Sequence, residues 1–273
     1  MRAFAVFLAA LALAGCIAVP GAVDVDHLAR PQDITGEVFP PLDAGASEQG
    51  SLHFLVRAYG SGKAMQAADL AEAAYQRIMV DTGLSSFRPL GGLYKVVLYA
   101  GADEYHKKTG QPAWSSGLSV GNSIYTYEGA HLESVISHEM SHLIFYEYMG
   151  RSDLELRWVN EGLAVYEESK AGQPASGGAA PPLPPWPQGW EPLSLDSVVR
   201  MVPASERERS VSAWYLQAHS MVRFLIERGG RIGFGQFLAA LKGGASVDKA
   251  LADGFPGSWR DLADFYSAWV KAQ

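Results

Sequence analysis

The chain has 273 residues, of which 48% are hydrophobic and 11% aromatic, and its formal net charge is −7. This apolar content is enough for a sizeable core and excludes a wholly disordered protein. The acidic balance argues against a phosphate-binding surface, which needs clustered Lys and Arg. We therefore expect no nucleic acid among the partners.

The first residues are typical of an exported protein. Arg2 supplies one positive charge, and residues 3–14 form an unbroken apolar run. This run has about the length of a signal-peptide core and is shorter than the ~20 residues of a membrane span. It ends in the sequence LAGC, which closes at Cys16 and resembles the lipobox of bacterial lipoproteins. In those proteins the chain is cut before a cysteine that becomes acylated.

Cys16 is the only cysteine of the chain, so it has no partner for an internal disulfide, and lipidation gives it a use. We predict a lipoprotein signal peptide over 1–15 and a lipid anchor at Cys16 that holds the protein to a membrane. This places the mature protein in the bacterial cell envelope, facing the periplasm or the exterior. The alternatives are an ordinary cleaved signal and an uncleaved anchor that continues through residues 17–19.

Residues 16–50 are expected to form a flexible tether, because they contain four prolines and show no sustained hydrophobic period. The folded domain is predicted over 51–273. Its first part, 51–150, should combine a small mixed sheet with helices. The patterns there predict strands over 51–60, 93–100 and 117–127, the last weakened by Gly117 and Gly121, and helices over 63–80, 103–108 and 131–149.

The remainder of the chain, 151–273, is expected to be a mostly helical lobe. The patterns there predict helices near 153–170, 210–228, 231–241 and 257–271. Strands followed by helices indicate the α+β class, with a cleft between the two lobes. Residues 172–192 are rich in Pro, Gly and Ala, and are predicted to be an exposed loop or a flap over the cleft.

The sequence SHEMSH carries the candidate chemistry. His138 and His142 stand at i and i+4 on a predicted helix, so both rings project from one side, close enough to share a metal ion. They fall in the same arc as apolar residues, which indicates that they face inward. Three polar residues sharing a helix by chance are the alternative. However, burying two imidazoles and the Glu139 carboxylate without partners would be costly, and a divalent cation removes that cost.

A third ligand is found downstream. Gly and His would stand at 145 and 148 in a metzincin, but this chain has Phe145 and Tyr148. Instead, Glu161 follows His142 with eighteen residues between them, within the sequence WVNEGLA. It lies on an apolar stripe of a second helix, which a capping box at 152–155 would begin. A glutamate there can close a His-His-Glu site with one open position.

This combination of H-E-x-x-H, eighteen residues and N-E-G-x-A resembles the gluzincin metallopeptidases, in particular the aminopeptidase catalytic domain and the smaller bacterial peptidase-MA-like domains. The motifs match over about 117–215, and the general layout is similar from residue 51 onward. The resemblance implies a thermolysin-like fold with the zinc cleft between its lobes. It also implies one Zn²⁺ bound by His138, His142 and Glu161, with Glu139 as the general base.

The resemblance suggests roles for further residues. A Tyr or His donor from the helical lobe would stabilise the oxyanion, and Tyr215 and His219 are the candidates. Asn160 would fix the ligand geometry from outside the ligand set. The strand before the zinc helix would pair with the substrate backbone through Leu118, Ser119, Val120, Gly121 and Asn122.

The expected activity is hydrolysis of a peptide or protein substrate by zinc-activated water. The chain lacks the G-x-M-E-N sequence with which the aminopeptidases hold a free amino terminus, which favours an endopeptidase or a narrow specificity. One alternative is a catalytically silent lipoprotein that keeps this fold as a binding or assembly factor. The presence of Glu139 argues against it, because a scaffold needs no base beside its ligands. Another alternative is a zinc hydrolase of non-peptide amides.

Overall fold

The computed structural model describes residues 38–84, 92–151, 153–173, 180–183, 186, 189–201 and 208–273. The predicted signal peptide, the lipid anchor at Cys16 and the first part of the predicted tether lie outside these residues. Within the described part of the chain, no helix is both long and apolar enough to cross a membrane.

One mixed sheet forms the first part of the fold. Its strands are β1 (Ala46–Gly50), β2 (Phe54–Tyr59), β3 (Tyr94–Tyr99), β4 (Gly117–Val120) and β5 (Ser123–Tyr127), in the spatial order β1-β2-β3-β5-β4. The three central strands run parallel, and β1 and β4 pair with them antiparallel at the two edges. The central strands are rich in Val, Leu, Tyr and Phe, as expected for strands that are covered on both faces.

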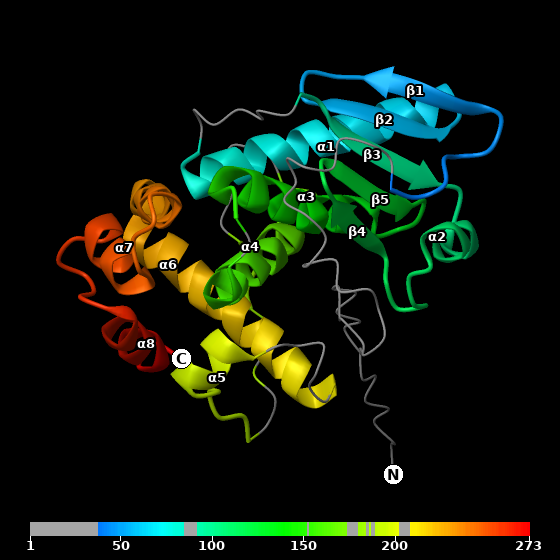
Figure 1. The fold of residues 1–273 in the computed structure, drawn as a ribbon. Coiled ribbons are helices and arrows are strands. Elements are labelled where there is room, and N and C mark those ends of the chain that lie inside the picture. The colour runs from blue at the N-terminus through cyan, green and yellow to red at the C-terminus, as the bar shows by residue number, and fades with distance from the viewer. Residues whose placement is uncertain are drawn as a thin grey trace, which may run out of the picture.

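Helices make up most of the rest, and they segregate as the α+β class requires. Figure 1 shows the sheet with α1 at one end of the molecule, α5 to α8 at the other, and α3 and α4 between them. The helices are α1 (Ser61–Thr82), α2 (Ala102–Thr109), α3 (Leu132–Met149), the 3₁₀ turn η3 (Leu154–Leu156), α4 (Arg157–Ser169), α5 (Leu195–Arg200), α6 (Glu208–Lys242), α7 (Val247–Gly254) and α8 (Leu262–Val270).

Alternation along the strands divides the buried side chains of the sheet between two layers. Val96 and Leu98 of β3 belong to the large core, on the face that α1 and α3 cover. Val97 and Tyr99 belong to a smaller core on the opposite face, which α2 covers together with the chain that precedes β1. The period of two along a strand produces this division directly.

Two sequence predictions about this part were wrong. Residues 46–50 form strand β1 rather than the end of a tether; this edge strand is polar and largely exposed, so it carries no hydrophobic alternation. The single strand predicted over 117–127 is a hairpin of β4 and β5. Gly121 stands at its turn with φ +60°, the left-handed conformation that the first position of a type II′ turn requires. The glycine at position 121 therefore sets a turn within the apolar segment, which divides it into two strands.

The helical part also differs from the sequence prediction. The two helices predicted over 210–228 and 231–241 exist, but they join without a loop at Gly230, whose φ is 78°. The last helix begins at Leu262 instead of 257, because the side chain of Asp261 caps it by accepting a hydrogen bond from Asp264 N. The sequence analysis missed α5 and α7, each only one or two turns long.

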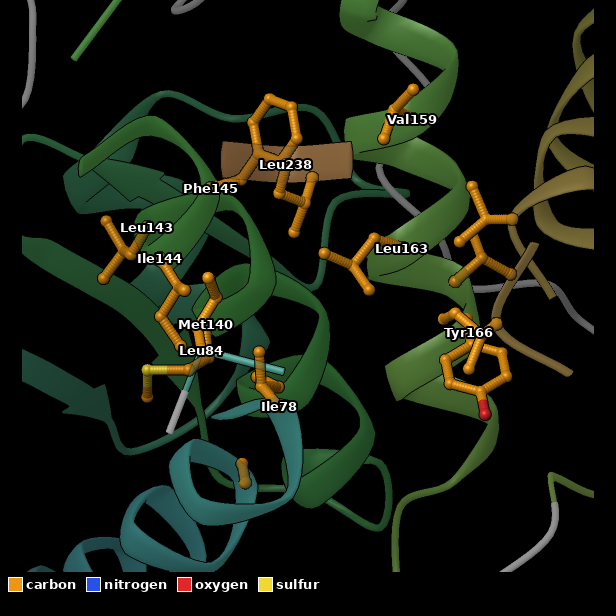
Figure 2. Close-up of a cluster of buried hydrophobic side chains, with 14 of the residues drawn as sticks. Ile78, Leu84, Met140, Leu143, Ile144, Phe145, Val159, Leu163, Tyr166 and Leu238 are labelled. Carbon is orange, nitrogen blue, oxygen red and sulfur yellow. The ribbon is translucent and has the colours of Figure 1, made fainter. Parts of the chain in front are cut away.

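The large core continues from α1 and α3, which cover the sheet, to the helical part of the fold. Figure 2 shows side chains from α1, α3, α4 and α6 meeting there, with Leu163 projecting from α4 toward α3. Ile144 of α3 and Val159 of α4 are almost fully buried in the same cluster. The pair α3–α4, which carries the HExxH motif and Glu161, is thus held in position by apolar packing on several sides.

Candidate metal centre

Helix α3 buries the three polar residues of the HExxH motif. It is apolar over most of its length, and His138, Glu139 and His142 are 3%, 2% and 7% exposed. The inward orientation predicted for the histidines is therefore confirmed. The helix ends at Gly150, whose left-handed φ of 66° lets its N–H bond back to the Tyr146 carbonyl.

Helix α4 brings the third candidate ligand to the same place. Asp153 accepts a hydrogen bond from Glu155 N and starts the 3₁₀ turn that leads into α4. The predicted capping box begins at Ser152, which lies outside the described residues, so the box stays a prediction. Glu161 follows one turn into the helix. The reversal between α3 and α4 points this residue back toward the histidines.

The three side chains converge as the spacing predicts. One ligand atom from each of His138, His142 and Glu161 lies within 4.8 Å of the others. The two imidazoles are nearly perpendicular, at 83°, and His142 Nε2 is 3.7 Å from Glu161 Oε2. A tetrahedral ion with bonds of about 2.0 Å sets its ligand atoms about 3.3 Å apart. This group could hold a metal ion.

A side-chain oxygen lies within hydrogen-bond distance of the Nδ1 atom of each histidine. His138 Nδ1 is 2.9 Å from Glu168 Oε2, and His142 Nδ1 is 3.1 Å from Asn160 Oδ1. Each contact directs Nε2 toward the shared position. His138 Nε2 is buried and has no hydrogen-bond partner among the described residues. A buried ring nitrogen without a partner fits a metal ion, which would replace its proton, and the paired Nδ1 atoms fit the outer contacts of ligating histidines.

The electrostatics of the group also favour a cation. Burial opposes a charge on His138, but the hydrogen bond to Glu168 and the negative charges of Glu168, Glu139 and Glu161 outweigh it. Together they raise the pKa of His138 from 6.5 to about 9. Three carboxylates gathered around two imidazoles therefore create a negative potential at the point where the ligand atoms meet.

Glu139 lies beside the edge of the sheet. A Cβ placed on Gly117, the first residue of β4, would be 3.3 Å from Glu139 Cγ and 2.5 Å from Val135 Cγ1. Only glycine lets β4 approach α3 this closely. The buried side chain of Glu139, which follows the candidate ligand His138 in the sequence, is thus packed against the edge strand.

The structure divides the predicted substrate-binding segment. Leu118, Ser119 and Val120 lie on β4, which is the edge strand of the described sheet, while Gly121 and Asn122 lie in the turn that follows. Leu118 and Val120 point into the smaller core. The alternation places Ser119 on the face of α3, together with Gly117.

The glycine of the N-E-G sequence has a packing role that the sequence did not reveal. A Cβ on Gly162 would stand 2.4 Å from the Ala218 carbonyl oxygen and 2.6 Å from Val222 Cγ2. Helices α4 and α6 are therefore in close contact at the residue after Glu161. The position of this candidate ligand depends on that contact.

We expect Gly162→Ala to lower the free energy of unfolding by about 1–3 kcal/mol, because the added methyl group forces α4 away from α6. Zinc affinity should fall as well, since Glu161 moves with the helix. Chemical denaturation and metal titration measure the two effects. Gly62→Ala is the matched control: Gly62 is also helical, but a Cβ there meets nothing within 4 Å. Equal effects of the two substitutions would contradict the close-contact interpretation.

Both candidate oxyanion donors lie on α6. Tyr215 is 8% exposed and packs edge-on against Trp214. His219 is 4% exposed, its ring contacts Tyr166 of α4, and its Nε2 has no hydrogen-bond partner among the described residues. Burial and the nearby charge of Arg223 lower the pKa of His219 to about 4. The structure places neither residue in the ligand group, and both roles remain predictions.

The neutral state of His219 makes stability depend on pH. Between pH 6.5 and 4 the unfolded chain binds this proton and the folded chain does not, so the unfolding free energy should fall as pH falls through that window. The full loss is about 3 kcal/mol. Urea denaturation of His219→Leu across the same range should show a shallower slope than the wild-type protein. Parallel slopes would assign the acid sensitivity to other groups.

The sequence analysis missed Glu168, although a signal was present. This residue stands two helical turns after Glu161, at i+7, and therefore on the same face of α4. The described part of 172–192 is irregular, as predicted. Trp186 and Trp190 stack with centroids 3.6 Å apart, and both contact Trp269 of α8 edge-on. These rings attach the segment to the helical part, and its role as a flap remains untested.

Comparison with known proteins assigns no family. No protein-family model matches the chain, and no curated protein matches it. The interpretation of the site therefore depends on its own geometry and chemistry.

Proposed function

We propose that this protein is a zinc-dependent peptidase of the gluzincin type, with a thermolysin-like arrangement of its two lobes. The observation that carries the proposal is the convergence of His138, His142 and Glu161 next to the buried carboxyl side chain of Glu139. A site that only stored a metal ion would gain nothing from burying Glu139, an acid that is not one of the three candidate ligands.

The donor set suits zinc, because two imidazoles and a carboxylate are among the ligand sets that hold it with one position open. When bound, Zn²⁺ supplies Lewis acidity, which makes water a nucleophile near neutral pH and polarises a carbonyl group. Glu139 then takes the proton of the attacking water and delivers it to the leaving amine. Asn160 and Glu168 keep the two imidazoles in the tautomer that presents Nε2 to the ion.

An extended peptide is the substrate that the surroundings support best. Among the described strands, β4 stands at the edge of the sheet next to β5, and an edge strand is where an extended peptide can add to a sheet. A peptide along that edge passes Glu139, because Gly117 brings the strand against α3. Without a G-x-M-E-N sequence to hold an amino terminus, cleavage within the peptide is the proposed mode.

The experiment is to measure the zinc content of the purified protein and its cleavage of a peptide library. We expect one zinc ion per chain, cleavage at internal bonds, loss of activity with a chelator, and recovery on addition of zinc. Zinc binding with no cleavage of any peptide would favour the silent binding factor. Cleavage of small amides alone would favour the amidase alternative.

We further propose that the protein is anchored in the bacterial cell envelope through a lipid on Cys16. The proposal is based on the apolar leader and the LAGC sequence. The Cys16→Ser variant should leave the membrane fraction, because a leader without an acylated cysteine supplies no lasting anchor. Fractionation and immunoblotting measure this change. Membrane association that persists in the variant would contradict lipidation.

A further inference from the structure

A buried arginine of α1 contacts both helices of the metal centre. Arg77 is fully buried. Its Nη2 donates to Ser137 Oγ of α3 at 2.6 Å, and its Nε donates to Glu167 Oε2 of α4 at 3.1 Å. A guanidinium group is suited to such a bridge, because its planar fork fixes two acceptors at once.

The two acceptors are the immediate neighbours of one hydrogen-bonded pair. Ser137 precedes His138, and Glu167 precedes Glu168. His138 and Glu168 are themselves joined at 2.9 Å between Nδ1 and Oε2. Arg77 therefore ties together the helix turns on which both members of this pair stand, although it touches neither.

The rest of the charge cluster lies farther from the ligands. Asp81, one turn after Arg77, accepts from Lys170, the residue that follows α4, and pairs with Arg231 of α6 at 3.0 Å. Burial and the charge of Asp81 raise the pKa of Glu167, while Arg77 and Lys170 oppose this. Buried ion pairs contribute little to stability compared with apolar residues of the same size. For the Arg77 bridge, which reaches the helix turns beside His138 and Glu168, fixed geometry is therefore a better explanation than added stability.

We propose that Arg77 is a positioning residue of the metal centre, which sets the distance between α3 and α4 at the His138–Glu168 contact and thereby the direction of His138 Nε2. This inference deepens the proposed function and depends on it for the identity of the ion. It requires no contact between Arg77 and the ion or the substrate.

The experiment compares Arg77→Met with Arg77→Lys and Ser137→Ala in the full chain. Zinc affinity is measured by competition with a chromophoric chelator, and the ligand geometry by the absorption spectrum of bound Co²⁺. We expect Arg77→Met to bind zinc about tenfold more weakly, the size of effect that outer contacts of metal ligands have. Its Co²⁺ spectrum should shift, and Arg77→Lys should restore part of both. Ser137→Ala should show the same changes to a smaller extent. If Arg77→Met does not fold, Ser137→Ala is the variant that tests the inference.

Lys170→Met is the control, because it breaks a buried ion pair of the same cluster without touching Ser137. It should lower stability but leave the zinc affinity and the Co²⁺ spectrum unchanged. In the metal-free protein, NMR of the His138 Nδ1 proton should show its hydrogen bond weakened in Arg77→Met and kept in Lys170→Met. Wild-type affinity, spectrum and Nδ1 signal in both Arg77→Met and Ser137→Ala would overturn the inference. None of these measurements uses a peptide. If the protein binds zinc but cleaves no peptide, the proposed peptidase function is wrong, while the inference about Arg77 can still be tested.

Discussion

The Glu139→Gln variant is expected to bind one zinc ion per chain with near wild-type affinity and to lose about 10²- to 10⁴-fold in peptide cleavage rate. The amide has the shape of the carboxylate but cannot accept the proton of the attacking water. Because Glu139 is buried beside β4, no solvent base can readily take its place. Metal analysis and steady-state kinetics on one peptide measure the two effects separately.

Glu48→Gln is the matched control for this substitution. Glu48 lies on β1 and pairs with Arg57 at 2.8 Å, and both side chains are partly exposed. It should change neither zinc binding nor rate, since an exposed ion pair contributes little. If the Glu139→Gln variant cleaves peptides at the wild-type rate, the general base lies elsewhere and the proposed mechanism is wrong.

The Glu161→Ala variant should bind zinc far more weakly, by more than about 100-fold, because it loses a direct ligand rather than an outer contact. Two imidazoles on one helix remain, and they leave the ion exposed to exchange with water. Competition with a chelator measures the affinity. Peptide cleavage should be lost at zinc concentrations that saturate the wild-type protein.

Two further alanine variants calibrate this result. Glu168→Ala keeps all three ligands and removes the oxygen at His138 Nδ1, so its affinity should fall by an intermediate 10- to 100-fold. Glu155→Ala removes an exposed carboxylate near the start of α4 and should have no effect. If Glu161→Ala binds zinc as tightly as Glu155→Ala does, Glu161 is not a ligand.

The convergence of the three candidate ligands could be predicted because each of them obeys a local rule. The i, i+4 spacing places His138 and His142 on one face, and the apolar stripe around Glu161 directs it into the interior. The convergence of α3 and α4 then follows from two consecutive amphipathic helices that share a core. The α+β class was predictable for the same reason.

Long-range contacts could not be predicted in this way. Arg77 lies sixty residues before Ser137 in the sequence, and no local pattern connects the two. The clash that a side chain at Gly162 would cause depends on Ala218, a residue of another helix. Strand β1 is specified by its pairing with β2 rather than by its own polar residues. Tertiary partners decide all three cases, and a single sequence does not name them.

The short sequence distance between the ligands has a consequence for folding. Only eighteen residues separate His142 from Glu161, so bringing them together costs little chain entropy. Under the proposed function, a refolding chain could bind the cation once α3 and α4 have packed together, before the C-terminal helices have docked. The bound ion would then stabilise the native packing of α3 against α4 relative to other collapsed states of the chain.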